Sequence, residues 1–158
     1  MLIIYIGERP GRLRMQRVAQ SQGPDQESWA VRVDSRSRTV MHAMTQASAG
    51  QLAKPGLYFA VTFDAIGMRI VTSAKESSPK YVVPRERIRE VRSLEYRVSY
   101  GRSESITITF DRDGKRFELP LVLVEWKFIS HRPIGSDRSA DVVDRLQSLW
   151  GLDRASTK

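Results

Sequence analysis

Apolar and polar residues alternate in two blocks of the chain, and the first block predicts a β-hairpin. Every second residue is large and apolar from Leu57 to Phe63, and the same alternation resumes at Met68 and Ile70. A period of two places successive side chains on opposite faces of a strand. The intervening segment, 64–67, contains Asp and Gly, which are typical turn residues. We therefore expect two antiparallel strands joined by a tight turn.

The second block predicts a three-stranded antiparallel meander over 94–120. Its apolar–polar alternations are separated by turn segments that contain glycine, at 101–103 and 111–115. A strict period of two is typical of a sheet with one face in the core and the other in solvent.

The apolar period changes near the C-terminus and predicts one amphipathic helix over 139–150. Its apolar residues recur at the spacing of one helical face: Val142, Val143, Leu146, Leu149 and Trp150. Ser139 is the expected N-cap, and Gly151 fits the left-handed position after the last turn. The apolar stripe needs a partner surface, which the sheet supplies. The expected fold is therefore mainly β (α+β): an antiparallel, partly open β-barrel or sandwich closed by one C-terminal amphipathic helix.

The first part of the chain has a weaker pattern. Leu2–Ile6 and Trp29–Val33 are expected strands, and Ser35–Ser37 is expected to turn into a further apolar stretch at 39–44. The small and polar run at 45–55 is interpreted as a connection, with a short helix as the alternative. We therefore divide the chain into an N-terminal β extension at 1–54, a barrel with its helix at 55–151 and a tail at 152–158.

The composition is that of a folded domain. The chain has 158 residues, of which 41% are hydrophobic and 28% charged, enough for one buried core. It contains no cysteine, which excludes disulfides, thiolate metal sites and cysteine nucleophiles. The N-terminal apolar run is too short for a signal peptide or a membrane span. We expect no transmembrane segment and a cytoplasmic location, either in solution or peripheral to a membrane.

The sequence contains few residues suited to catalysis or metal binding. Its two histidines, His42 and His131, have no His, Asp or Glu at metal-ligand spacing on the same element. Asp111 and Asp113 are explained by the turn in which they lie, and Gly-rich phosphate loops and nucleophile motifs are absent. We expect a protein that is not an enzyme and that has no catalytic, cofactor-binding or metal-binding residue.

Arginine dominates the positive charge. The chain holds 20 arginines and 6 lysines against 18 acidic residues, which gives a net charge of +8. Because guanidinium groups bind phosphate and carboxylate oxygens in a bidentate manner, this bias suits an anionic partner. The candidate anion-binding residues form two clusters: Arg9, Arg12, Arg14, Arg17, Arg85, Arg87, Arg89 and Arg92. A compositional bias of the genome explains the same excess without any role in binding.

The second cluster has two interpretations of its own. On an extended strand, Arg85, Arg87 and Arg89 would share one face and form a row of phosphate contacts. The same segment would otherwise be a solvent-exposed edge with Arg–Glu ion pairs, which also discourages aggregation between sheet edges. Nearby Tyr81, Tyr96 and Tyr100 could stack on bases. The alternation, however, places Tyr96 and Tyr100 in the core with Leu94.

The order of these elements resembles a known family. Leu57–Thr72 is similar to the hairpin of bacterial pleckstrin-homology-like and GRAM-like domains, in which a glycine and an apolar residue open the return strand. Tyr81–Val91 is similar to their following strand, and the meander and the C-terminal helix complete the order over about 55–151. The resemblance implies a partly open β-barrel plugged by the helix at one end. It also implies a binding or scaffolding role, with anionic lipid headgroups and peptides among the ligands of the wider fold.

Two other motif patterns are incomplete. The basic pair by which eukaryotic members bind phosphoinositides has no match in the first hairpin loop, so no lipid-binding residue is carried over. Arg85 and Arg89 satisfy the RxxxR half of the pattern of cyclic-dinucleotide-binding PilZ domains. The second half fails at 137–142, because Val142 stands where that pattern requires glycine.

The leading hypothesis is a non-enzymatic interaction or scaffolding module that binds a protein partner or assembles with itself. The alternative is electrostatic binding of an anionic ligand, either a nucleic acid or an acidic membrane surface, through the arginine clusters. The two hypotheses differ in salt dependence, because binding led by phosphate contacts weakens steeply as the salt concentration rises.

Overall fold

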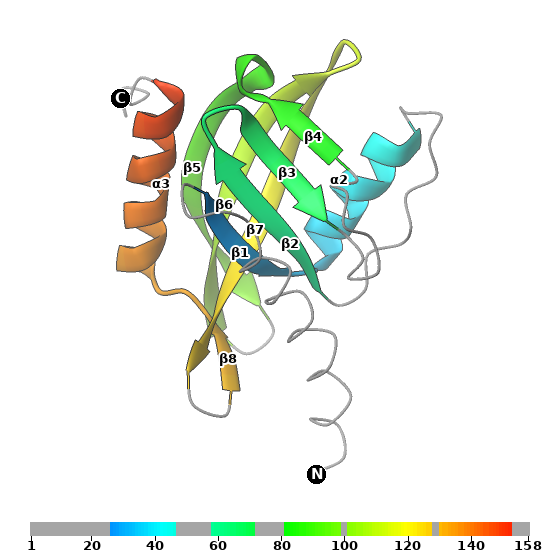
Figure 1. Cartoon of the computed structure of the whole chain (residues 1–158). Helices are drawn as coiled ribbons and strands as arrows, with labels where there is room; N and C mark the ends of the chain where they lie inside the picture. Colours follow the sequence, from blue (N-terminus) through cyan, green and yellow to red (C-terminus); the bar gives the residue numbers. More distant parts are fainter. Residues whose placement is uncertain (1–25, 47–57, 72–80, 99–100, 128–129, 153–158) are drawn as a thin grey trace, which may run out of the picture.

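The computed structural model describes residues 26–46, 58–71, 81–98, 101–127 and 130–152. They form one antiparallel sheet flanked by helices (Figure 1). The strands are β1 (Glu27–Arg32), β2 (Tyr58–Asp64), β3 (Gly67–Val71), β4 (Tyr81–Pro84), β5 (Ile88–Val98), β6 (Gly101–Arg112), β7 (Lys115–Lys127) and β8 (Ser130–Pro133). The helices are α2 (Ser35–Gln46), the 3₁₀ turn η1 (Arg85–Arg87) and α3 (Ser136–Trp150).

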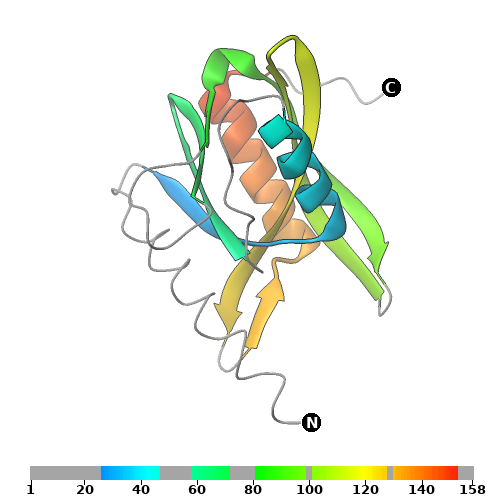
Figure 2. The same ribbon diagram turned by 90° about the vertical axis from the view of Figure 1, so that its right-hand side faces the viewer.

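The strands follow one another across the sheet in the order β4-β3-β2-β1-β7-β6-β5, and β8 pairs with β7. Among the described residues, β4 and β5 lie at the two ends of this path and do not pair with each other. The sheet is therefore open, and it curls so that α2 and α3 lie apart from each other, yet both contribute to the same core (Figure 1 and Figure 2). These features confirm the predicted mainly β, antiparallel, partly open fold with a C-terminal helix.

β1 lies in the middle of the sheet. Its Ala30 pairs with Ala60 of β2 on one side and with Val124 of β7 on the other. The sheet therefore contains residues from both sides of the boundary that the sequence placed after residue 54. The predicted strand at Leu2–Ile6 lies outside the described residues.

The β2–β3 hairpin forms where the alternation predicts it. Asp64 pairs with Gly67 across the turn, and its Oδ1 accepts hydrogen bonds from the backbone N–H groups of Ile66 (2.9 Å) and Gly67 (3.1 Å). Gly67 has a φ of +144°, and a Cβ built there would lie 2.1 Å from the carbonyl oxygen of Val83. Only glycine therefore allows β4 to approach the hairpin this closely.

β2 is buried on both faces, whereas the alternation predicted one face in solvent. Its odd-numbered residues from Phe59 to Phe63 belong to the main core. Its even-numbered residues are covered as well, because Tyr58 and Ala60 belong to a second buried cluster with residues of β1, β3 and β7. Thr62, on the same face, is only 3% exposed. The alternation thus locates the strand and its two faces but does not reveal that the second face is enclosed.

The β5–β6–β7 meander is also confirmed, with longer strands than the alternation indicates. Ile106, Ile108 and Phe110 of β6 belong to the main core. Asp113 and Gly114 form the tight turn between β6 and β7, with φ values of +50° and +73°. This left-handed pair is the conformation that an Asp-Gly sequence favours in a two-residue hairpin turn.

Leu94 does not face the core, which corrects one detail of the predicted meander. It is 42% exposed, and the register pairs it with Ser105 of β6. Val91 pairs with Ile108, and both are buried. Because Leu94 is three residues after Val91, the alternation of the strand places it on the opposite face. The side chain of Tyr96, which was expected to accompany Leu94, lies outside the described ones.

Residues 35–46 form the helix α2, where the sequence predicted a turn and a further extended stretch. The helix follows Asp34, whose Oδ1 accepts a hydrogen bond from the backbone N–H of Ser37 (2.8 Å). In return, the Oγ of Ser37 accepts one from the backbone N–H of Asp34 (3.0 Å), and this reciprocal cap stabilises the start of the helix. Met41 and Met44 of α2 join the main core. The prediction was wrong because polar and small residues around these methionines obscure the helical period.

α3 begins earlier than predicted and ends as predicted. Ser139 is not the N-cap, because it lies inside the helix and its backbone N–H bonds to the carbonyl of Gly135 (2.9 Å). Gly151 has a φ of +56°, and the N–H groups of Gly151 and Leu152 bond to carbonyls of the last turn, as in a Schellman motif. Leu149 of the predicted stripe is exposed. Among the described residues, the helices are too short or too polar to cross a membrane.

The last residue of α3 anchors the helix to the sheet. The Nε1 of Trp150 donates a hydrogen bond to the backbone carbonyl of Asp64 (2.8 Å), and the indole packs edge-on against Phe63, with ring centroids 5.8 Å apart. One turn earlier, the side-chain amide of Gln147 donates to the carbonyl of Val91 (2.9 Å). The helix therefore covers β5 and β6 and is tied to the β2–β3 turn at its C-terminal end.

We expect Asp34→Ala to destabilise the protein by about 1 kcal/mol, because the N-cap hydrogen bonds of α2 are lost. Asp34→Asn keeps an acceptor oxygen and should cost less. Burial raises the pKa of Asp34, but hydrogen bonds from the Ser37 backbone and from Arg36 outweigh burial, so the pKa lies below its ordinary value. A carboxylate with a lowered folded-state pKa stabilises the fold above its unfolded-state pKa. This contribution is lost as the pH falls through the folded-state pKa.

Urea denaturation at neutral and at acidic pH measures both effects. The control is Ser35→Ala, which changes an exposed residue of the first helical turn. Equal stability of Asp34→Ala and wild type at neutral pH would contradict the assigned cap.

A second pair of variants tests the close approach of β4 to the β2–β3 hairpin. Gly114→Ala has open space around its Cβ, so we expect only the cost of the left-handed backbone, about 1–2 kcal/mol. Gly67→Ala adds a clash with the backbone of β4 and should cost roughly 3 kcal/mol or more. Thermal or urea unfolding measures both values, and a Gly67→Ala variant no less stable than Gly114→Ala would refute the close approach.

Candidate functional site

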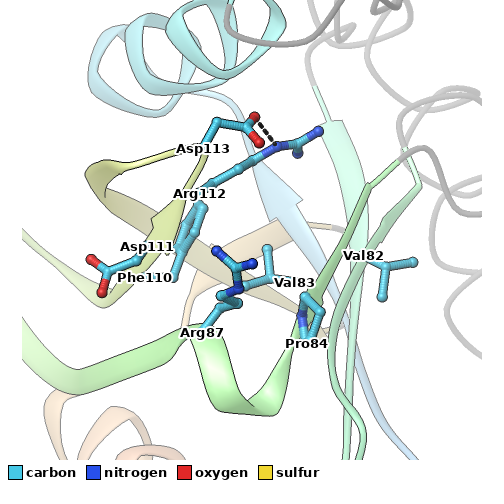
Figure 3. A pocket seen from close by; sticks show the side chains of 8 residues that line it. All are labelled: Val82, Val83, Pro84, Arg87, Phe110, Asp111, Arg112 and Asp113. Carbon is cyan, nitrogen blue, oxygen red and sulfur yellow. Dashed lines mark ion pairs between the residues drawn. The ribbon is translucent and has the colours of Figure 1, made fainter.

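A pocket of about 210 Å³ lies between β4, η1 and the β6–β7 turn (Figure 3). Its floor includes the buried side chains of Val83 and Phe110. Its rim carries charged residues from both walls. The lining residues are Val82, Val83, Pro84, Arg87, Phe110, Asp111, Arg112 and Asp113.

The first wall is formed by the turn η1, which corrects the predicted row of arginines. Pro84 has φ −61° and ψ +149°, and the chain after it makes one 3₁₀ turn, closed by the N–H of Ile88 on the carbonyl of Arg85. The N–H of Arg85 also bonds to the carbonyl of Ile66 in the β2–β3 turn (2.7 Å). Arg85 and Arg87 therefore do not lie on an extended strand, and they do not share a strand face with Arg89. The turn is fixed at both ends, and Arg87 points from it toward the β6–β7 turn (Figure 3).

The second wall is formed by the end of β6. The guanidinium carbon of Arg112 lies 5.0 Å from the centre of the Tyr81 ring, a cation–π contact that bridges the opening between β6 and β4. The Nε of Arg112 lies 3.6 Å from a carboxylate oxygen of Asp113, longer than a good hydrogen bond. Asp113 is in the turn, and its side chain is 59% exposed. Its ion pair with Arg112 is therefore loose.

Asp111 is held by two other arginines. Its carboxylate accepts hydrogen bonds from the Nε of Arg89 (2.6 Å) and from the Nε of Arg116 (3.0 Å). These contacts, with that of Arg116 the larger, lower the pKa of Asp111 below its ordinary value. Figure 3 shows the carboxylate of Asp111 turned away from Arg112. Asp111 therefore neutralises charge beside the pocket rather than within it.

The predicted anion-binding residues differ in their ion-pair partners in the structure. Arg89 is paired with Asp111, and Arg92 bonds to Glu118 on β7 (3.1 Å), so these two fit the interpretation of an edge with local ion pairs. Arg85 and Arg87 form no side-chain ion pair or hydrogen bond with any described residue. The remaining candidates lie outside the described part of the chain: Arg9, Arg12, Arg14 and Arg17.

The pocket contains residues that the sequence analysis did not assign to a binding site. Phe110, Arg112 and Asp113 come close to η1 only because the sheet curls, and no local pattern joins segments this far apart in the chain. Tyr81 is buried beneath Arg112, which makes it a support of the wall rather than a surface for stacking bases. Within the described ranges, no group of three or more His, Cys, Asp or Glu residues could hold a metal ion.

No protein-family model matches this chain, and no curated protein sequence matches it.

We expect the carboxyl group of Asp111 to titrate below the ordinary value of about 3.9, because Arg116 and Arg89 stabilise its charged form. Arg116→Gln should raise this pKa more than Arg89→Gln does. Carboxyl ¹³C NMR over an acid titration measures the pKa in each variant. Arg92→Gln, which removes the partner of Glu118 instead, should leave Asp111 unchanged, and a similar shift in this control would refute the assigned pairs.

Proposed function

We propose that this protein is a non-enzymatic interaction module, built on a pleckstrin-homology-like barrel, that binds a protein partner or a second copy of itself. The single observation that carries the proposal is the pocket at the open end of the sheet. Its apolar floor and charged rim are the composition of a recognition surface rather than of a core. The resemblance of residues 55–151 to pleckstrin-homology-like domains supports the same class of function.

The size of the pocket favours a macromolecular partner. Its volume is about 210 Å³, below the roughly 300–1,000 Å³ of pockets that enclose a whole small-molecule ligand. A space of this size suits one side chain or one small group of a larger partner. Arg87 at the rim is exposed, so a partner can reach the pocket from the protein surface.

Electrostatic binding of nucleic acid or of an acidic membrane surface is the second candidate. One observation favours it: neither Arg85 nor Arg87 forms a side-chain ion pair within the described ranges. These two arginines would contact two phosphates, which gives a slope of log K against log salt concentration of about −1.8 on duplex DNA. A slope of much larger magnitude would require additional arginines, such as those at 9–17.

The experiment uses the full chain as bait in a nuclease-treated extract at high salt. We expect wild type to retain a protein partner, and we expect Arg87→Trp to lose it because the indole blocks the rim of the pocket. The matched control is Arg32→Trp, which replaces an exposed arginine on β1 and should retain the partner. Light scattering identifies the case in which the partner is a second copy, since Arg87→Trp would then dissociate the oligomer.

Two results would refute the proposal. One is retention or self-association that is identical in wild type and Arg87→Trp. The other is binding that disappears on nuclease treatment or at high salt, which would favour the polyanion candidate instead.

A further inference from the structure

We propose that the pocket between β4, η1 and the β6–β7 turn binds a single carboxylate, the side chain of an Asp or Glu in the partner protein. Arg87 is the primary contact and Arg112 the second. This inference rests on the proposed function, because it names the group by which a protein partner is recognised.

Among the described residues, one cation of the pocket has no ion-pair partner. Arg87 forms no ion pair with any described residue. Arg112 faces Asp113, and Asp111 is shared by two arginines outside the pocket. Of the cations that line the pocket, Arg87 is therefore the one without an ion pair to a described residue, and one negative charge on a ligand would balance it.

The charged side chains of the pocket also favour a carboxylate over a phosphoryl group as the ligand. Asp113 lines the pocket and is only loosely paired, and its charge would repel a dianion more strongly than a monoanion. Phosphate groups carry about −1.5 to −2 charges at neutral pH. A carboxylate also has the geometry that accepts two parallel N–H groups from one guanidinium.

Asp113 competes with the carboxylate of the ligand for Arg112. Its contact with Arg112 is long, at 3.6 Å, and its side chain is 59% exposed. An exposed ion pair of this kind contributes only about 0–1 kcal/mol, so an incoming carboxylate can displace it at small cost. Removing the charge of Asp113 should therefore strengthen binding rather than weaken it.

The apolar floor of the pocket favours a ligand that carries methylene groups, such as an amino-acid side chain, over a free anion. Val83, Pro84 and Phe110 present apolar surface below the two guanidinium groups. The methylene groups of Glu would lie against this surface while the carboxylate reaches Arg87 (Figure 3). The backbone of the partner would then pass over the rim, beside the exposed Val82.

The experiment is an NMR titration of the full ¹⁵N-labelled chain with two blocked tripeptides, N-acetyl-Val-Glu-Val-amide and its Gln counterpart. We expect the Glu peptide to shift backbone signals of the pocket residues in 82–87 and 110–114, and the Gln peptide to shift them little. Arg87→Gln should weaken binding of the Glu peptide roughly tenfold, since a charge-assisted hydrogen bond is lost. Asp113→Asn should strengthen it about threefold, as expected from the loss of an exposed competing ion pair.

Arg32→Gln is the matched control, because it removes the same charge from an exposed site outside the pocket. It should bind the Glu peptide as wild type does, and the dispersion of the spectra verifies that each variant is folded. Equal shifts with the Gln peptide, or unchanged affinity in Arg87→Gln, would overturn the inference. Tighter binding of the corresponding phosphoserine peptide would also overturn it, in favour of a phosphoryl ligand.

The outcomes separate this inference from the proposed function. If Arg87→Trp releases the partner but Arg87→Gln does not, the pocket is a protein-binding surface and its assigned carboxylate chemistry is wrong. If both variants retain the partner, the function proposed for the pocket is wrong as well.

Discussion

The structure depends on the polar groups of Asp64, which join three parts of the chain. The side chain accepts hydrogen bonds from two backbone N–H groups of the β2–β3 turn and forms an ion pair with Arg69. The backbone carbonyl accepts the indole N–H of Trp150 and so fixes the end of α3. Ile66, in the same turn, accepts the N–H of Arg85 and so fixes η1. The wall of the pocket that carries Arg87 is therefore held by the turn that also anchors the C-terminal helix.

The open sheet explains why a pocket lies at this place. An antiparallel sheet that does not close must protect its edges. Both edge strands of this sheet carry a feature that interrupts regular strand pairing. β4 is short and ends in Pro84, and the register of β5 shifts between Ile88 and Glu90. The 3₁₀ turn η1 lies between them, and among the described strands β4 does not pair with β6. The space between them is bridged by the contact of Arg112 with Tyr81, and the pocket remains beside this bridge.

The sequence patterns predicted those parts of the fold that depend on interactions between residues close together in the chain. The β2–β3 hairpin, the Asp-Gly turn of the meander and Gly151 at the end of α3 follow from alternation, turn chemistry and left-handed backbone, and each is confirmed. The helix α2 was missed although Asp34 and Ser37 form a recognisable capping pair, because its apolar residues are sparse. The face of Leu94 was missed because apolar residues of β5 lie on both faces, and only the face of Val91 is in the core. The pocket could not be predicted at all, since its two walls meet only through the curl of the sheet.

The arginine content of the chain is a poor guide to where an anion binds. In the sequence, four arginines are equivalent candidates for binding an anion: Arg85, Arg87, Arg89 and Arg92. In the structure they differ, because only some of them form an ion pair with a described residue. Arg89 and Arg92 reach carboxylates on β6 and β7, and exposed pairs of this kind cancel charge while adding little stability. An anion is attracted by the charge that remains after such pairing, and a net charge of +8 does not locate that charge. Among the described residues that line this pocket, Arg87 is the cation without an ion pair, and the proposed recognition of one defined group depends on this side chain.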